Sequence, residues 1–228
     1  MTVIVDDSNF RNIAQAIRER NGTENTYNPN EMAGAIRAIE TGGSESDVLL
    51  TQLISNRASI TNITFPTGIT KIDNNAFSGC NKLAVTELPA TITYIGNYAF
   101  QYCYKLPLTS LPSGITYIGQ HAFANCSILA ITELPEGITE INTNSFSSCK
   151  ALTTITIPAA VQYVWTSAFS LCSALTSVTF NGTPEEIASN AFNNCTNLTP
   201  INVAWAEGAV DGAPWGATNA TITYNYTA

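Results

Sequence analysis

The hydrophobic and polar positions of residues 60–203 recur every 23 residues. Phenylalanine, cysteine and leucine each keep this spacing, as does an isoleucine that is once replaced by valine. The phenylalanines are Phe77, Phe100, Phe123, Phe146, Phe169 and Phe192, and the cysteines are Cys80, Cys103, Cys126, Cys149, Cys172 and Cys195. Because several residue types share one period, the segment is a tandem repeat. Repeats of this length predict a solenoid, here of six full units and a partial seventh.

Each unit is predicted to contain two short extended segments and a bend. The first segment shows alternation, as in Ile155-Thr156-Ile157, which buries one face of a short strand. A proline follows in most units and ends the strand because it has no N–H to donate. An Ile-x-x-Ile stretch forms the second segment, and an Ala-Phe pair predicts a tight bend or one helical turn. Three units carry the first apolar residue one position early, so we expect a locally altered strand there. These residues are Val85, Leu108 and Ile131.

A single unit is too small to bury its own leucine, isoleucine and phenylalanine side chains. Stacking on neighbouring units would bury them, with parallel strands in register and a rise of roughly 5 Å per repeat. We therefore expect side chains at equivalent positions to form columns along the solenoid.

The cysteines are predicted to form a ladder of buried thiols. A disulfide needs Cβ atoms about 3.5–4.5 Å apart with a suitable dihedral angle, whereas equivalent side chains on stacked strands point the same way about 4.8 Å apart. The chain contains no Cys-x-x-Cys, and one cysteine per coil cannot build a tetrahedral metal site. We expect the thiols to be small apolar fillers beside each phenylalanine.

Composition argues against several classes of function. Nine basic and seventeen acidic residues give a net charge of −8, which disfavours nucleic-acid binding. The single histidine, His121, excludes a multi-histidine metal site, and it occupies a position filled elsewhere by Asn, Tyr or Ser, so we expect it to face solvent. No phosphate-binding, dinucleotide-binding or hydrolase motif occurs. We expect no catalytic residue, no cofactor and no metal.

The N-terminal residues do not share the repeat. Helical spacing of apolar residues predicts a hairpin of two helices over 1–40, the second beginning near Pro29. Residues 41–46 are predicted to be a flexible linker, and residues 47–59 a capping helix over the first repeat. Neither an apolar membrane span nor a signal peptide is visible, and the localisation is left open.

The C-terminal residues 204–228 also depart from the repeat. An open solenoid end exposes core side chains and an unpaired strand edge. Trp205, Trp215 and a strand over 220–226 are therefore predicted to form a C-terminal cap. The alternative is a carbohydrate site lined by the tryptophans.

Units such as ITYIGNYAFQYCYKL and LTTITIPAAVQYV resemble the BspA-type leucine-rich repeat family over about 60–203. The resemblance implies a right-handed leucine-rich repeat solenoid, mainly β with short turns or helical bends. It also implies bacterial surface or secreted proteins that bind other proteins or host matrix without catalysis. The stretch IAQAIRERNGTENTYNPNEMAGAIRAIE looks like a module of phage and prophage tail-associated proteins, which implies attachment to a virion or tail protein through residues 1–40.

One repeat position between buried isoleucines is predicted to form an outward-facing stripe. It is occupied by Lys71, Tyr94, Tyr117, Glu140 and Tyr163, with Trp165 beside its end. Exposed aromatic side chains offer large contact area at low entropic cost, although tyrosine also simply favours strands. We expect a module for adhesion or recognition that binds a protein or glycan on a cell surface or matrix, without membrane insertion. The alternative is a structural component of a phage or prophage tail.

Overall fold

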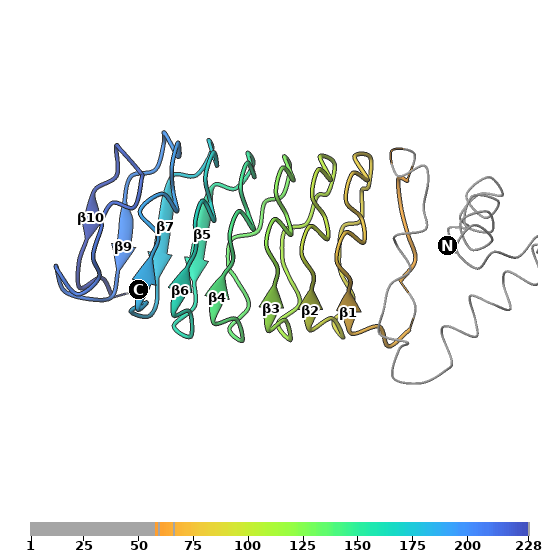
Figure 1. The fold of residues 1–228 in the computed structure, drawn as a ribbon, viewed down its shortest axis with the longest axis horizontal. Helices are drawn as coiled ribbons and strands as arrows, with labels where there is room; N and C mark the ends of the chain where they lie inside the picture. The colour runs from red at the N-terminus through yellow and green to blue at the C-terminus, as the bar shows by residue number, and fades with distance from the viewer. Residues whose placement is uncertain (1–57, 59, 66, 228) are drawn as a thin grey trace, which may run out of the picture.

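The computed structural model describes residue 58, residues 60–65 and residues 67–227. The predicted helical hairpin over 1–40 and the linker over 41–46 lie outside the described residues, as does the capping helix over 47–59 apart from Ala58. The described part is a β-solenoid of about seven turns whose coils stack along one axis (Figure 1).

The strands of the described residues form three parallel sheets. Their order is β1-β2-β3 in one sheet, β4-β6-β8 in the second and β10-β9-β7-β5 in the third. The strands are β1 (Lys71–Ile72), β2 (Tyr94–Ile95), β3 (Tyr117–Ile118), β4 (Glu140–Ile141), β5 (Thr154–Ile157), β6 (Tyr163–Val164), β7 (Ser177–Phe180), β8 (Glu186–Ile187), β9 (Ile201–Val203) and β10 (Ile222–Thr223). The predicted parallel stacking is confirmed, because the sequence period sets the register, as in the pairing of Tyr94 with Tyr117.

The first two sheets run along one edge of the solenoid and are joined through a side chain. In several coils the backbone N–H that follows the strand donates to the preceding coil, as from Gly119 to the Ile95 carbonyl at 2.8 Å. Between β3 and β4, the side-chain amide of Asn142 donates to the Ile118 carbonyl at 2.8 Å. Asn142 is itself buried, so this bond also satisfies a polar group inside the stack.

The third sheet contains fewer strands than the repeat pattern predicts. β5 and β7 show the predicted alternation, with their apolar side chains buried. In the unit that contains Val85, the next buried side chain is Leu88, three positions later. An extended strand would place these two side chains on opposite faces. The three displaced units therefore contain no described strand here, apart from the isolated bridge between Glu133 and Thr156.

The bend of each unit is a series of turns, and the alternative of one helical turn is not observed in the described units. Two repeat positions have a left-handed backbone, the first in five coils and the second in six. The first is held by Asn75, Tyr98, His121, Asn144 and Ser167, with φ between 55° and 60°, and the second by Gly79, Tyr102, Asn125, Ser148, Leu171 and Asn194. Between them the backbone donates to the following coil, as from Phe100 to the Ala122 carbonyl at 2.7 Å. These bonds link the coils where no regular strand does.

The phenylalanines form the column that the repeat predicts. Adjacent rings are stacked, with centroids 5.2–5.5 Å apart and planes 5–16° from parallel. Each of the six phenylalanines is at most 1% exposed to solvent. The spacing agrees with the predicted rise of roughly one inter-strand distance per coil. The column is the continuous interior that no single coil could build.

The cysteines lie beside this column as a buried ladder of thiols, as predicted. Five of the thiols donate to the carbonyl of the phenylalanine 26 residues earlier, with sulfur–oxygen distances of 3.0–3.3 Å. Burial raises the pKa of Cys126 and Cys149 well above the usual value of a thiol. For these two residues the protonated thiol is therefore the stable form, and it is also the hydrogen-bond donor, a role that the apolar-filler interpretation did not include.

Two tryptophans pack around Phe180, whose ring centroid lies 6.3 Å from that of Phe192, the last ring of the column. Trp215 is fully buried and Trp205 is 5% exposed, and the Phe180 ring lies 5.3 Å from the Trp205 ring and 6.2 Å from the Trp215 ring. β10 pairs with β9, although the strand is shorter than the predicted 220–226. Buried indoles cannot line an exposed carbohydrate site. We retain as a proposal that residues 204–228 act as the cap.

Candidate functional site

The five residues predicted to form the stripe lie on successive strands of one solenoid edge. Lys71, Tyr94 and Tyr117 pair in register through β1, β2 and β3. Glu140 and Tyr163 pair through β4 and β6, and β8 extends the row with Glu186, which the sequence analysis did not include. In each strand the next residue is buried, so alternation directs the stripe outward.

Two tyrosines form a stacked pair in the first half of the stripe. The Tyr94 and Tyr117 rings are 4.8 Å apart and 8° from parallel. Both side chains are half-buried, and burial followed by the nearby Tyr117 and Asp73 raises the pKa of Tyr94. The pair presents a neutral aromatic edge that is already ordered before any partner binds.

A second aromatic pair lies in the half of the stripe nearer the C-terminus. The Tyr163 and Trp165 rings are 5.4 Å apart and 10° from parallel. The indole Nε1–H of Trp165 donates to Glu140 Oε2 at 2.9 Å, and the Tyr163 hydroxyl donates to Glu185 Oε2. The hydrogen bond to Glu185 raises the pKa of Tyr163, so the phenol remains protonated at neutral pH. Two carboxylates thus fix the orientation of both rings.

His121 is half-buried, so it keeps only part of the solvent exposure that its repeat position predicts. Its ring stacks on Tyr98, with centroids 4.8 Å apart, and its Nε2 lies 3.4 Å from Asn144 Nδ2. Burial lowers the pKa of His121, which favours the neutral ring at pH 7. Cys126 is fully buried and bonded to the Phe100 carbonyl, so the two side chains do not form a catalytic pair at the surface. The sequence signal for the Tyr98–His121 stack was the presence of an aromatic residue at the same repeat position in two neighbouring units.

A hollow of about 380 Å³ lies beside the acidic half of the stripe. It is formed by β8 with its preceding residue and by the loop 208–212. Its charged lining side chains are Glu185, Glu186 and Asp211, and Val210 supplies a buried apolar contact. No lysine or arginine lines it among the described residues.

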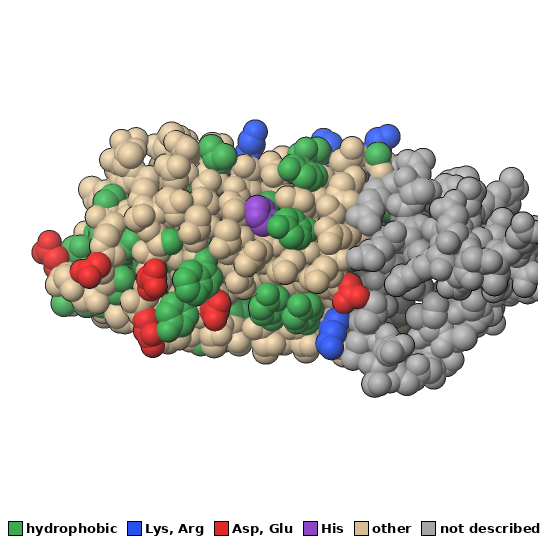
Figure 2. All heavy atoms as spheres, in the orientation of Figure 1, with side chains coloured by type: hydrophobic (Ala, Val, Ile, Leu, Met, Phe, Trp, Pro, Cys, Tyr) green, Lys and Arg blue, Asp and Glu red, His purple; other side chains and the backbone are tan. Residues whose placement is uncertain are grey.

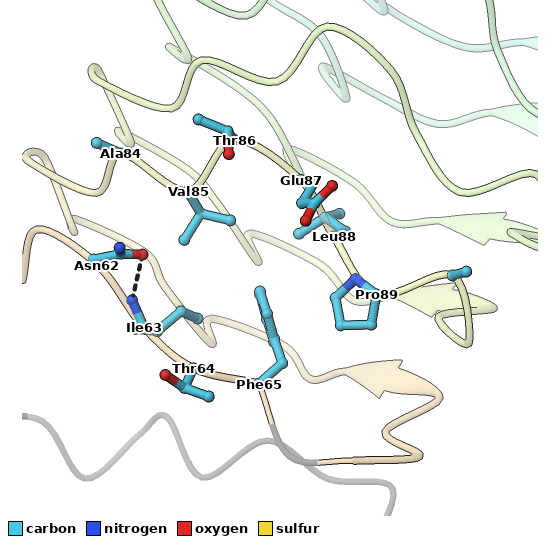
Figure 3. Close-up of a pocket in the computed structure, with 11 residues that line it drawn as sticks. Asn62, Ile63, Thr64, Phe65, Ala84, Val85, Thr86, Glu87, Leu88 and Pro89 are labelled. Atoms are coloured by element: carbon cyan, nitrogen blue, oxygen red, sulfur yellow. Dashed lines mark hydrogen bonds between the residues drawn. The ribbon is translucent and has the colours of Figure 1, made fainter. Parts of the chain in front are cut away.

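A larger hollow of about 620 Å³ lies where the first unit meets the second (Figure 3). Residues 62–65 form one wall and residues 84–90 the other. It lies where a unit of alternating apolar positions meets a unit with the displaced pattern. Glu87 is the only charged side chain among the described residues that line it. The lining therefore offers no convergent chemistry.

The described residues hold no cluster that could bind a metal. No group of three or more His, Cys, Asp or Glu side chains is suitably placed among residues 58, 60–65 and 67–227. In the same part of the chain, no helix has the length and apolar character needed to cross a membrane.

Comparison with known proteins gives one family and three solved structures. The model described as BspA type leucine rich repeat region matches residues 52–151 and 93–206, in 6 copies. A leucine rich repeat protein from T. pallidum is similar at 30% identity and a TM-score of 0.50, over 59% of this chain and 65% of that one. No curated protein matches the chain.

Two further crystal structures are more distant. A leucine-rich repeat protein from Bacteroides ovatus has 19% identity and a TM-score of 0.40, over 77% of this chain and 64% of that one. A leucine rich cell surface protein from Faecalibacterium prausnitzii has 21% identity and a TM-score of 0.29, over 68% of this chain and 63% of that one. The chain spans less than two thirds of each of the three proteins.

Proposed function

Because the chain belongs to the BspA-type leucine-rich repeat family, we propose that it is a recognition module that binds a protein or glycan on a cell surface or matrix. Leucine-rich repeats are a non-catalytic fold class, and we extend this to the chain itself: it acts by binding and not by catalysis. The stripe, with Trp165 beside it, is the proposed binding surface.

The two stacked aromatic pairs carry this proposal. Tyr94 with Tyr117 and Tyr163 with Trp165 lie along one outward-facing edge, already held in place by stacking and by carboxylate hydrogen bonds. Figure 2 shows hydrophobic side chains gathered along this edge, with acidic groups beside one set of them. A pre-ordered aromatic surface loses little side-chain entropy on binding, which is why such residues dominate recognition surfaces. The alternative of a phage-tail component rests on residues 1–40, which lie outside the described residues.

Replacing Tyr94, Tyr117 and Tyr163 together with serine tests the stripe. We expect the triple variant to fold, because the side chains face outward, and to lose binding by about tenfold or more as three aromatic contacts are removed. The full chain and the variant would be compared on an array of glycans and matrix proteins. Circular dichroism and thermal unfolding would establish that both are folded.

A second triple variant provides the matched control. Tyr102, Tyr104 and Tyr226 are 42%, 43% and 38% exposed and lie outside the stripe. Their replacement with serine removes the same number of phenols and should leave binding unchanged. Equal binding by the stripe variant and the wild type, or equal loss in both triple variants, would overturn the proposal.

A further inference from the structure

The charged side chains of the described residues are unevenly distributed. Figure 2 shows lysines along the edge opposite the stripe, one lysine at the N-terminal end of the stripe and acidic side chains gathered toward the C-terminal end. The stripe itself changes from Lys71 at its beginning to Glu140 and Glu186 in its second half. Such segregation favours a partner whose charge is complementary to the acidic end.

At the acidic end, carboxylates and aromatic faces occur together. Glu140 and Glu185 each use one oxygen to hold the Trp165–Tyr163 pair, which leaves the second oxygen of each carboxylate as an acceptor. Glu186 is exposed and shares its strand register with Tyr163. A cation placed here would meet both the negative face of an aromatic ring and carboxylate oxygens able to accept its hydrogen bonds.

The hollow beside this pair gives the cation a recess. Glu185 and Glu186 line it on one side and Asp211 on the other, while Val210 and Ile187 contribute apolar surface. Apolar surface next to carboxylates suits a long side chain that has an aliphatic stem and a charged head. A bare metal ion is a poor match, because the described carboxylates do not form a metal-binding group.

The acidic corner is formed by Glu140, Tyr163, Trp165 and the hollow of Glu185, Glu186 and Asp211. We propose that it binds an arginine or lysine side chain of a partner protein. The inference rests on the proposed function and assigns its partner as a protein with a basic surface segment. Arginine fits best, because its planar guanidinium stacks on an aromatic face and makes paired hydrogen bonds with carboxylates.

A labelled peptide of alternating arginine and glycine is the probe. Its binding to the full chain would be measured by fluorescence anisotropy at low and at physiological salt, beside a peptide with glutamine in place of each arginine. We expect the arginine peptide to bind and the glutamine peptide not to bind. Glu185→Gln with Glu186→Gln should weaken binding by about tenfold, because the charge is lost while the amide oxygen introduced by Glu185→Gln can still accept the Tyr163 hydroxyl proton. Trp165→Leu should weaken binding by about threefold or more.

The matched control removes the same charge elsewhere. Glu87 and Glu133 are exposed and lie outside the stripe, on the first extended segment of their units. Glu87→Gln with Glu133→Gln should change binding less than about twofold, because neither glutamate lines the hollow or bonds to the aromatic pair. Equal weakening by both double variants would show attraction to net charge alone and overturn the inference.

The inference can fail separately from the proposed function. Absence of arginine-peptide binding, or displacement of that peptide by a neutral oligosaccharide, would overturn the assignment of a basic protein partner. If the stripe variant nevertheless lost binding on the array, the recognition role of the stripe would stand. If neither the stripe variant nor the acidic-corner variants changed binding, both proposals would be wrong.

Discussion

Replacing Phe123 with alanine is expected to lower the free energy of unfolding by about 3–5 kcal/mol. The ring is fully buried and stacks between Phe100 at 5.3 Å and Phe146 at 5.5 Å. Its removal leaves a cavity in the middle of the column, and the coils on both sides cannot close it because their strands and turns are hydrogen-bonded in register. Urea unfolding followed by circular dichroism measures the change.

An exposed aromatic residue of the same region is the control for this substitution. Tyr104 is 43% exposed, and its replacement with alanine should change the free energy of unfolding by no more than about 0.5 kcal/mol. A Phe123→Ala loss below about 1 kcal/mol would show that the column contributes little to stability. That result would contradict the packing described here.

Gly119→Ala is expected to destabilise the protein by about 1–3 kcal/mol although it adds only one methyl group. A Cβ at this position would lie 2.5 Å from Asn97 Oδ1 and 2.6 Å from the Asn97 backbone nitrogen. Asn97 cannot move away freely, because its Oδ1 accepts the backbone N–H of Gln120 at 2.8 Å. Chemical denaturation of the variant measures the cost.

Gly114→Ala is the matched control in the same coil. The nearest atom to an added Cβ there is 3.8 Å away, and its backbone is not left-handed. We expect a change within about 0.5 kcal/mol, because the methyl group meets no close contact and the unfolded chain becomes slightly less flexible. Equal destabilisation by the two alanine variants would mean that the close contact at Gly119 is not the cause.

Asparagine and glycine are coupled between neighbouring coils at this place. Asn74 precedes Gly96 by the same interval as Asn97 precedes Gly119, and a Cβ on Gly96 would also lie 2.6 Å from the Asn74 backbone nitrogen. Each asparagine side chain bonds to a backbone N–H of the next coil, as from Asn97 N–H to Asn74 Oδ1 at 2.7 Å. The glycine makes room for that asparagine. The glycine of one coil and the asparagine of the preceding coil are therefore sterically coupled.

The sequence period was sufficient to predict what the core contains. Every unit offers one phenylalanine and one cysteine at a fixed interval, and only stacking of coils can bury all of them. The column of rings and the buried thiols follow directly from that interval. The resemblance to BspA-type repeats, carried by the same residues, is confirmed by the family match.

The period could not predict the backbone conformation within each coil. The position of His121 was interpreted from the side chains that occupy it, whereas all its occupants except Asn190 share a left-handed backbone. Asparagine, present there as Asn75 and Asn144, was the available signal, since it adopts this conformation more readily than most residues. The thiol bonds to the Phe carbonyls were also missed, because they depend on the relative placement of neighbouring coils.

The site was predictable only along the repeat. The outward position of Tyr94, Tyr117 and Tyr163 follows from alternation between buried residues. The hydrogen bond from Tyr163 to Glu185 and the hollow that includes Asp211 join segments from different coils and from the non-repeating C-terminal part. The repeat places Glu185 beside Tyr163 in the next coil, but no interval in the sequence relates the loop 208–212 to either residue.

Thiol accessibility tests most directly whether equivalent side chains form buried columns. The folded full chain would be treated with an aromatic disulfide reagent at pH 8, then unfolded in guanidinium chloride in the presence of the same reagent. Because all six cysteines are buried, we expect almost no thiol to react before unfolding and six to react after it. Rapid reaction in the folded protein, or an intact mass that shows disulfides, would contradict the stacked-coil structure.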